Sequence, residues 1–175
     1  MSSHVFQGLD DPSKPSPSQP VVARMYDWYL GGTHSYEIDR KAAEATQRAL
    51  PDIKPLVVEN RSFLRRAVRY LAKNGYTQFI DIGSGLPTVG NTHEAVLRVN
   101  PGARILYVDI EASAVNEGNE FIRKTGWADQ VGMIRASALE PENIFNDPET
   151  RRVIDFDKPV VILKIALVHF FRPQQ

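Results

Sequence analysis

The chain has 175 residues, 42% of them hydrophobic, with 21 basic and 21 acidic side chains. This length suits one domain with a substantial core rather than two. The formal net charge is zero, so no basic excess favours nucleic acid or an anionic membrane surface, and we expect neither partner. The absence of cysteine excludes disulfides, thiolate nucleophiles and Cys-ligated zinc, and it fits a reducing compartment, so we expect a cytoplasmic protein.

The first 20 residues are rich in Ser and Pro and lack a sustained apolar pattern. Such a segment cannot offset the entropy of its own ordering, so we predict a disordered tail at residues 1–20. The longest apolar run, residues 160–171, is interrupted by Lys164 and His169 and is too short to span a bilayer.

Residues 21–40 combine many aromatic and charged side chains with the pair Gly31 and Gly32. Two Arg–Asp pairings are available, from Arg24, Asp27, Asp39 and Arg40. One interpretation is a short helix at residues 22–30 that the Gly pair ends and that packs on the core through its aromatics. The other is a lid over a ligand, with the Gly pair as hinge.

Two further helices precede residue 75. Asp39 is a candidate N-cap for a helix at residues 40–50, and Pro55 suits the first position of a helix that runs to about residue 73. In the second helix, apolar residues recur at helical spacing and four arginines fall largely elsewhere. We interpret these arginines as a solvated face rather than an anion site: Arg61, Arg65, Arg66 and Arg69.

Beyond Gly75, short apolar runs alternate with helical stretches. Strands are predicted at residues 77–82, 104–109, 131–136 and 160–168. Helices are predicted at residues 91–99 and 112–124, and a helix broken near Pro148 at residues 141–154. This alternation predicts an α/β fold with a doubly wound parallel (Rossmann-like) sheet over residues 75–175, with a topological switch point beside the first strand.

The first strand runs into a glycine-rich turn, in the stretch QFIDIGSGLPTVGNTHE at residues 78–94. Asp81, Gly83 and Gly85 stand at the carboxyl end of that strand, where such sheets bind ligands. The glycines permit positive φ and a close approach of ligand to backbone. Asn91 and Glu94 form a plausible capping pair for the helix that follows.

The second strand ends in Asp109, at about the distance past the glycines where an acidic residue accepts from ribose hydroxyls in dinucleotide-binding folds. A pyrophosphate-binding turn needs a third glycine, which Thr88 replaces here. Pro87 offers no N–H to a phosphate, and Leu86 offers an apolar wall. The turn therefore suits an adenosine with an uncharged sulfur chain better than a diphosphate.

Five motifs together resemble a family of actinobacterial S-adenosylmethionine-dependent methyltransferases of unassigned substrate. They are ARMYDWYLGG, ENRSFLRRAVRYL, DIGSGLPTVGNTHE, LYVD and LVHFF, and the resemblance extends from about residue 20 to residue 171. It implies a class I methyltransferase fold with additional N-terminal helices, S-adenosylmethionine as cofactor and methyl transfer to a small-molecule substrate.

The resemblance also implies which residues hold the cofactor. Gly83, Ser84, Gly85 and Asp109 would bind it, and we extend this set to their neighbours Asp81, Leu86 and Ile110. The N-terminal motif would close over the cofactor as a helical lid or cap at residues 21–74, mainly through Arg24, Tyr26 and Asp27.

Three positions depart from the family pattern. Ser137 stands after the third strand, where an Asp usually accepts from the adenine amino group, and its hydroxyl can still hydrogen-bond, more weakly. Ile110, Glu111 and Ala112 replace an Asn-Asp-Pro sequence after Asp109. Lys164 lies in the middle of the last predicted strand, where a buried lysine needs a partner.

The sheet predicted here has fewer strands than a complete class I methyltransferase. Residues 160–168 would form a long, apolar, unpaired edge, which natural proteins avoid. We therefore expect either a C-terminally truncated chain with an incomplete sheet, or a second copy in a homo-oligomer that covers this edge.

Methyl transfer from a sulfonium needs alignment more than acid–base chemistry. His169 is the best candidate for a substrate-side proton acceptor, and the alternative is a histidine packed by Phe170 and Phe171. His93, in the first turn of a helix, either contacts cofactor or substrate or is a solvent-facing cap. The histidines show no metal spacing, so we predict no metal.

Two other classes of function stay open. A nicotinamide-dependent oxidoreductase would use the same Asp109 but needs the missing third glycine. A non-catalytic nucleotide-binding or regulatory module fits the absent strands and the weaker acceptor at Ser137.

Overall fold

The computed structural model describes residues 18–87 and 90–171, so most of the predicted tail, and Thr88, lie outside the described residues. The chain divides into two compact units, Met1–Glu59 and Asn60–Gln175. This division falls inside a long helix, earlier in the chain than the boundary predicted after residue 74.

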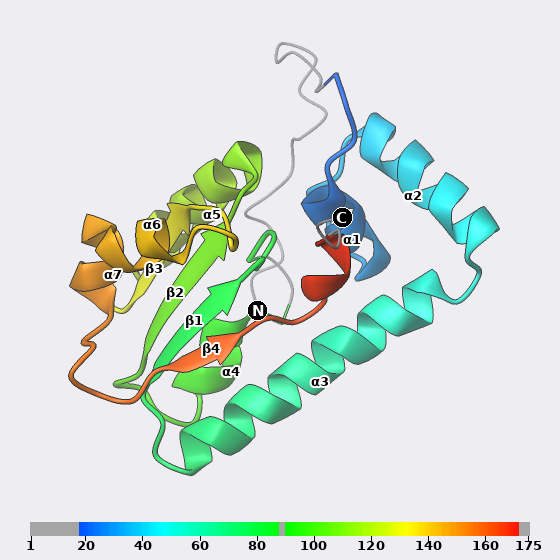
Figure 1. The fold of residues 1–175 in the computed structure, drawn as a ribbon. Coiled ribbons are helices and arrows are strands. Elements are labelled where there is room, and N and C mark those ends of the chain that lie inside the picture. Colours follow the sequence, from blue (N-terminus) through cyan, green and yellow to red (C-terminus); the bar gives the residue numbers. More distant parts are fainter. Residues whose placement is uncertain (1–17, 88–89, 172–175) are drawn as a thin grey trace. The chain divides into compact units, whose positions relative to one another are not determined.

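The first unit is helical. Its elements, labelled in Figure 1, are α1 (Val22–Tyr29), α2 (Glu37–Ala49) and the beginning of α3 (Ile53–Lys73). The predicted stop after α1 is confirmed, because Gly31 has a φ of +80°. Tyr29, Ala43 and Val57 form a small buried core, in which the Tyr29 hydroxyl donates a hydrogen bond to the Ala43 carbonyl at 2.8 Å.

The predicted N-cap role of Asp39 is wrong. Because α2 begins at Glu37, Asp39 lies inside its first turn and reaches back to accept the Tyr36 N–H at 2.9 Å. The carboxylate therefore caps the helix from the third position rather than from the N-cap. Pro55 likewise lies within the first turn of α3, not at its first position, where its missing N–H is equally harmless.

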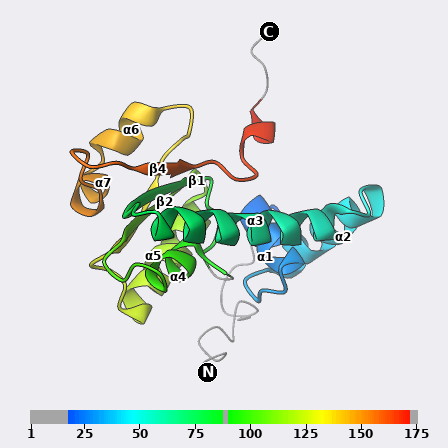
Figure 2. The same cartoon turned by 90° about the horizontal axis from the view of Figure 1, so that it is seen from below.

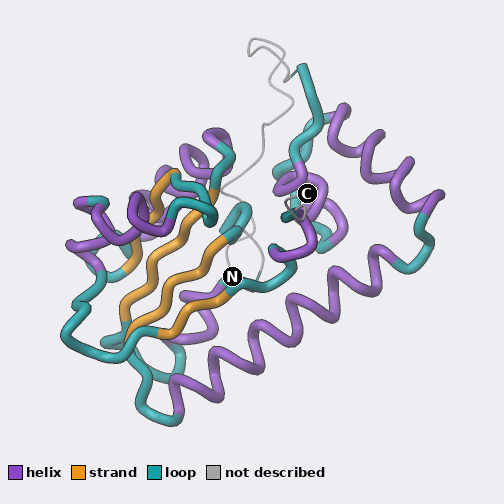
Figure 3. The backbone as a smooth tube through the Cα atoms, viewed as in Figure 1, coloured by secondary structure: helices purple, strands orange, loops and turns teal. Residues whose placement is uncertain are grey.

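The second unit contains a parallel sheet, shown in orange in Figure 3. Within the described residues its four strands are β1 (Gln78–Ile82), β2 (Arg104–Asp109), β3 (Val131–Arg135) and β4 (Val161–Leu163). Their order is β3-β2-β1-β4, and each pair of neighbours is parallel. The chain thus continues from β1 in one direction and returns to its other side with β4, which confirms the doubly wound sheet and the switch point beside β1.

Helices cover both faces of this sheet (Figure 2). These helices are α4 (Thr92–Leu97), α5 (Ala112–Thr125), α6 (Pro141–Asn146) and α7 (Pro148–Val153). On one face Phe79, Ile105 and Val131 pack with side chains of α3, α4 and α5; on the other, Ile80 and Leu106 pack with α6 and α7. Burial on both faces explains why the strands are almost continuously apolar. The predicted break at Pro148 is confirmed.

The predicted solvated face of α3 is largely confirmed. Arg65, Arg66 and Arg69 are exposed, and Arg61 is half-buried.

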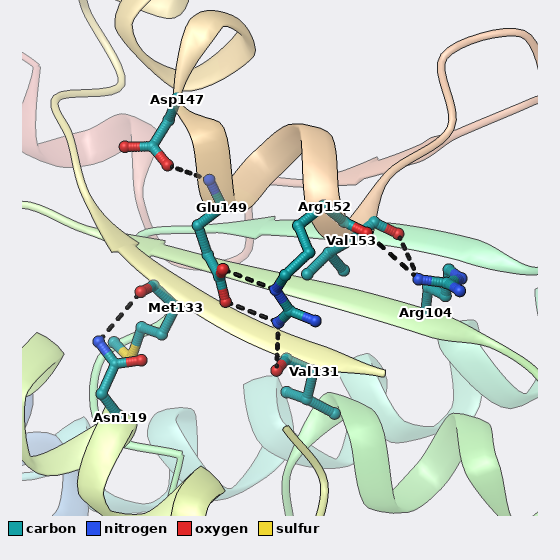
Figure 4. Close-up of polar contacts among 8 residues, drawn as sticks. All are labelled: Arg104, Asn119, Val131, Met133, Asp147, Glu149, Arg152 and Val153. Atoms are coloured by element: carbon teal, nitrogen blue, oxygen red, sulfur yellow. Dashed lines mark hydrogen bonds and ion pairs between the residues drawn. The ribbon is translucent and has the colours of Figure 1, made fainter. Parts of the chain in front are cut away.

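Polar contacts attach α7 to the sheet (Figure 4). The Arg104 guanidinium donates to the carbonyls of Arg152 and Val153 at the end of α7, at 3.3 and 3.5 Å. Arg152 in turn forms two 2.7 Å hydrogen bonds to Glu149 and one of 3.5 Å to the Val131 carbonyl. This arrangement places cations at the carboxyl end of a helix, where its dipole favours them.

The predicted long strand at residues 160–168 is wrong. Strand β4 ends at Leu163, the partner of Asp81, one residue before β1 itself ends at Ile82. A turn follows, in which Ala166 has a φ of +53°, and then a short 3₁₀ helix, η1 (Val168–Phe170). Lys164 consequently lies outside the strand and is exposed, so the buried lysine expected there does not occur.

Candidate functional site

The glycine turn folds back against the second strand immediately after β1. The N–H groups of Gly83 and Ser84 both donate to the Val108 carbonyl, at 2.8 and 3.2 Å. The predicted positive φ is confirmed at Gly83 (+73°) and Gly85 (+63°). A Cβ on Gly83 would also approach the Leu167 side chain to 2.7 Å, so a larger residue there would have to displace Leu167 in addition to adopting the positive φ.

Asp109 holds the glycine turn directly. One carboxylate oxygen accepts the Gly85 N–H at 2.7 Å, and the other accepts the Glu111 N–H at 3.0 Å. The side chain is nearly buried, with 8% exposure. The two features that the sequence analysis paired, the turn after β1 and the acid at the end of β2, therefore lie together at one edge of the sheet.

Asp81 is a second carboxylate at this edge, and it is buried inside β1. The Thr92 hydroxyl donates to it at 2.7 Å. Burial raises the pKa of Asp81 to about 6, while the Thr92 hydrogen bond and the positive charge of Arg61 act in the opposite direction. This carboxyl is therefore still mostly ionised at neutral pH, but its pKa lies much closer to 7 than that of an exposed aspartate.

His93 is not a solvent-facing cap, since it is 1% exposed. Its Nδ1 lies 2.7 Å from the Tyr107 hydroxyl, and its ring also contacts Phe121 and Trp127. Burial lowers its pKa to about 4, so the imidazole is neutral at physiological pH. A direct contact of His93 with cofactor or substrate stays a prediction.

The expected capping pair of Asn91 and Glu94 is also wrong in its geometry. Asn91 is the N-cap residue of α4, but its side-chain amide donates to the Pro87 carbonyl at 2.7 Å and to Glu94 at 3.3 Å. The Glu94 carboxylate thus accepts a hydrogen bond from the side-chain amide of Asn91 rather than from a main-chain N–H. Leu86, predicted as an apolar wall, is buried.

Two predicted cofactor-binding residues follow neighbouring strand ends. Ile110 comes after β2 and is 59% exposed, which leaves an apolar side chain open beside Asp109. Ser137 comes after β3 and is half-buried, and its hydroxyl oxygen accepts the Leu139 N–H at 3.2 Å.

The N-terminal motif forms its own polar network in the first unit. An Arg–Asp pair is present between Arg24 and Asp39, whose charged atoms lie 2.8 Å apart. Asp27 is buried and accepts the His34 N–H at 2.9 Å. The Tyr26 hydroxyl donates to the Val57 carbonyl at 3.4 Å. The closure of Arg24, Tyr26 and Asp27 over a cofactor stays a prediction.

His169 lies in η1, beyond the turn that follows β4, and it is exposed. Its ring centroid is 4.2 Å from that of Phe170. In the part of the chain that the structure describes, no group of three His, Asp or Glu side chains could hold a metal ion. Nor does any described helix have the length and apolar character needed to cross a membrane.

Sequence reasoning missed Thr92, Tyr107 and Leu167. Thr92 and Tyr107 bind the predicted site residues Asp81 and His93, and Leu167 packs on Gly83. A hydroxyl in the first helical turn and a tyrosine inside an apolar strand are weak signals, because neither reveals which side chain it faces.

Comparisons with known proteins agree with this architecture. A family model described as S-adenosyl methyltransferase matches residues 11–175. A provisionally named methyltransferase from Thermobifida fusca YX is 41% identical with a TM-score of 0.82; the match covers 89% of this chain and 57% of that one. A DUF574 family protein from Streptomyces avermitilis MA-4680 is 34% identical with a TM-score of 0.78, over 87% of this chain and 58% of that one.

The chain thus spans less than two thirds of the length of each of these two proteins. No curated protein matches it. The similarity in structure establishes the class of fold, an α/β methyltransferase sheet with flanking helices. Since the family model matches most of its length, the chain belongs to the S-adenosyl methyltransferase family.

Proposed function

We propose that this chain binds S-adenosylmethionine at the edge formed by the ends of β1 and β2, and that it transfers the methyl group to a small-molecule acceptor. The observation that carries the proposal is the 2.7 Å hydrogen bond between Asp109 and the Gly85 N–H. It joins the glycine turn to the acidic residue that would recognise a ribose.

The residues at this edge fit the cofactor. Each Asp109 oxygen accepts one main-chain N–H, and a carboxylate oxygen has a second lone pair for a ribose hydroxyl. The exposed side chain of Ile110 offers an apolar surface for adenine, and Ser137 offers a hydroxyl to its amino group. Asp81 supplies a buried negative charge suited to the cationic end of the methionine part.

When bound, the cofactor supplies a sulfonium methyl, whose charged leaving group favours attack by a nucleophile. The protein's own part is to bind, orient and exclude water. Asp109 holds the glycine turn and would accept hydrogen bonds from the ribose hydroxyls. Asp81 would balance the positive charge of the methionine part of the cofactor. His169 is proposed to accept the proton of an acceptor hydroxyl or amine.

Titration calorimetry with S-adenosylmethionine, S-adenosylhomocysteine and NAD tests this function. We expect both sulfur ligands to bind, and Asp109→Asn to weaken them by about 10- to 100-fold, because it removes a charged acceptor. The exposed Asp129 provides the matched control, since Asp129→Asn makes the same change of charge outside the proposed site. NAD binding without a response to the sulfur ligands would refute the proposal. Binding of both sulfur ligands with no methyl transfer to any acceptor would favour a non-catalytic module.

The proposed homo-oligomer rests on a weaker physical basis than the sequence suggested. Strand β4 is three residues long, and short edge strands are one way in which proteins avoid edge pairing. Apolar side chains nevertheless stand exposed on it and in the loop that precedes it, among them Ile162 (49%) and Phe156 (48%). A second copy that covers them would double the mass measured by light scattering, whereas a monomer at micromolar concentration would exclude it.

A further inference from the structure

Two consecutive residues at the start of α4 hold two strands of the sheet. Asp81 of β1 and Tyr107 of β2 are direct partners in the strand register. Thr92 donates to Asp81 at 2.7 Å, and His93 contacts the Tyr107 hydroxyl through its main-chain N–H at 2.9 Å and its Nδ1 at 2.7 Å. We call these four side chains the α4 clasp.

His93 and Tyr107 are joined by two hydrogen bonds. The His93 main-chain N–H donates to the Tyr107 oxygen at 2.9 Å, and His93 Nδ1 shares a second hydrogen bond with the same hydroxyl at 2.7 Å, in which the imidazole tautomer decides the donor. Burial keeps Tyr107 protonated and His93 neutral at physiological pH. His93 Nε2 has no hydrogen-bond partner within the described residues, so the imidazole's hydrogen bond there is the one to Tyr107.

The clasp connects the residues on either side of the glycine-rich stretch, because Thr92 is hydrogen-bonded to Asp81. Asp81 lies two positions before Gly83, and Thr92 lies two positions after Gly90. A shift of α4 along the sheet would break the Thr92 and His93 contacts together, since both come from one helical turn. The separation of the ends of the stretch, and with it the path of the turn at Gly83 and Gly85, therefore depends on the clasp.

We propose that His93, Tyr107 and Thr92 are positioning residues, which set the conformation of the glycine turn and thereby the affinity of the site for an adenosyl ligand. They act through Asp81 and through the main chain of the turn. This inference rests on the proposed function for its ligand, but the conformation of the turn can be measured without any ligand.

The alternative is that the clasp contributes to core stability alone. The chain offers a matched control at the opposite end of β1. The buried side chain of Gln78 also makes hydrogen bonds, accepting the Asp155 N–H at 2.6 Å and donating to the carbonyls of Asp155 at 2.8 Å and Pro159 at 3.5 Å. Gln78→Met removes these buried bonds away from the turn, as Tyr107→Phe removes the two bonds of the tyrosine hydroxyl.

The experiment measures amide hydrogen exchange in the ligand-free full chain, together with thermal unfolding of each variant. We expect Tyr107→Phe to accelerate exchange at Gly83, Ser84 and Gly85 by about tenfold, since the loss of a buried hydrogen bond lowers the free energy of local opening. Gln78→Met should lower the unfolding temperature to a similar extent and leave these three amides unchanged. Thr92→Val, which breaks the other half of the clasp, should reproduce the effect of Tyr107→Phe and provides a second test if that variant fails to fold.

Calorimetry with S-adenosylhomocysteine on the same variants gives the second readout. Tyr107→Phe should weaken binding about tenfold, and Gln78→Met should bind like the wild type. Unchanged exchange at the turn in both clasp variants would overturn the inference, as would wild-type affinity despite faster exchange. If the wild type itself does not bind S-adenosylhomocysteine, the proposed function fails, and the exchange data still decide whether the clasp positions the turn.

Discussion

Replacing Asp81 by Asn should remove the pH-dependent contribution that the Asp81 carboxyl makes to the stability of the fold. Asp81 is buried in β1, where a single hydroxyl, that of Thr92, donates to it at 2.7 Å. Burial raises its pKa in the folded protein from 3.8 to about 6. Between these two pH values the folded state binds more protons at this site than the unfolded state does, so stability falls as the pH rises.

The size of this effect follows from the pKa difference. A rise from 3.8 to about 6 corresponds to about 3 kcal/mol, at about 1.4 kcal/mol for each pKa unit. The contribution is present in full below about pH 4 and is lost above about pH 6. Asn cannot ionise, so the variant lacks this pH dependence. The free energy of unfolding of Asp81→Asn, measured relative to that of the wild type, should therefore be about 3 kcal/mol higher at pH 7 than at pH 4.

Urea unfolding at several values of pH between about 4 and 7 measures this difference. Asp129→Asn, a change at an exposed carboxylate, should follow the pH dependence of the wild type. A stability difference between wild type and Asp81→Asn that stays constant within about 0.5 kcal/mol over this range would refute the reasoning.

Three further substitutions, each measured by urea unfolding, test contacts within one or the other of the two units. Asp39→Asn should destabilise the chain by about 3–5 kcal/mol, because it removes the buried charge that pairs with the Arg24 guanidinium at 2.8 Å; a loss below about 1 kcal/mol would contradict this. Gly118→Ala should destabilise it by about 1–3 kcal/mol, since the new Cβ would meet the Met133 sulfur in a tightly packed layer, and an unchanged urea midpoint would show that the layer adapts. Glu149→Gln should change stability by less than about 1 kcal/mol, because its ion pair with Arg152 is partly exposed; a larger loss would mean that this pair holds α7 on the sheet.

Local patterns were sufficient to predict the centre of the fold. The alternation of apolar runs with helical stretches located β1 to β3 to within a residue, because both faces of these strands are buried and their sequences are therefore largely apolar. The positive φ of Gly83 and Gly85 could likewise be predicted from residue type. The proximity of Asp109 to Gly85 followed from the rule that parallel strands end at a common edge.

Features set by tertiary neighbours could not be predicted in the same way. The run at residues 160–168 is as apolar as a strand, but it pairs with β1 only as far as Leu163. His93 lies in the first turn of α4, where the sequence left a ligand contact and a solvent-facing cap both open, and the packing of α4 against β2 buries it beside Tyr107. In both cases the deciding contact comes from a residue distant in sequence, about which a local pattern carries no information.

The two carboxylates of the site differ in a way that predicts how ligand affinity depends on pH. Asp109 accepts two main-chain N–H groups, whereas Asp81 is buried with one hydroxyl donor, an arrangement that disfavours its charged form. A ligand that places a cation beside Asp81 needs the ionised carboxylate, so binding below a pH of about 6 must first remove a proton. Affinity for S-adenosylhomocysteine should then fall by about tenfold between about pH 7 and pH 5 in the wild type, and much less in Asp81→Asn. Calorimetry across this range decides the question: equal pH dependence in the two proteins would mean that the ligand does not place its charge at Asp81.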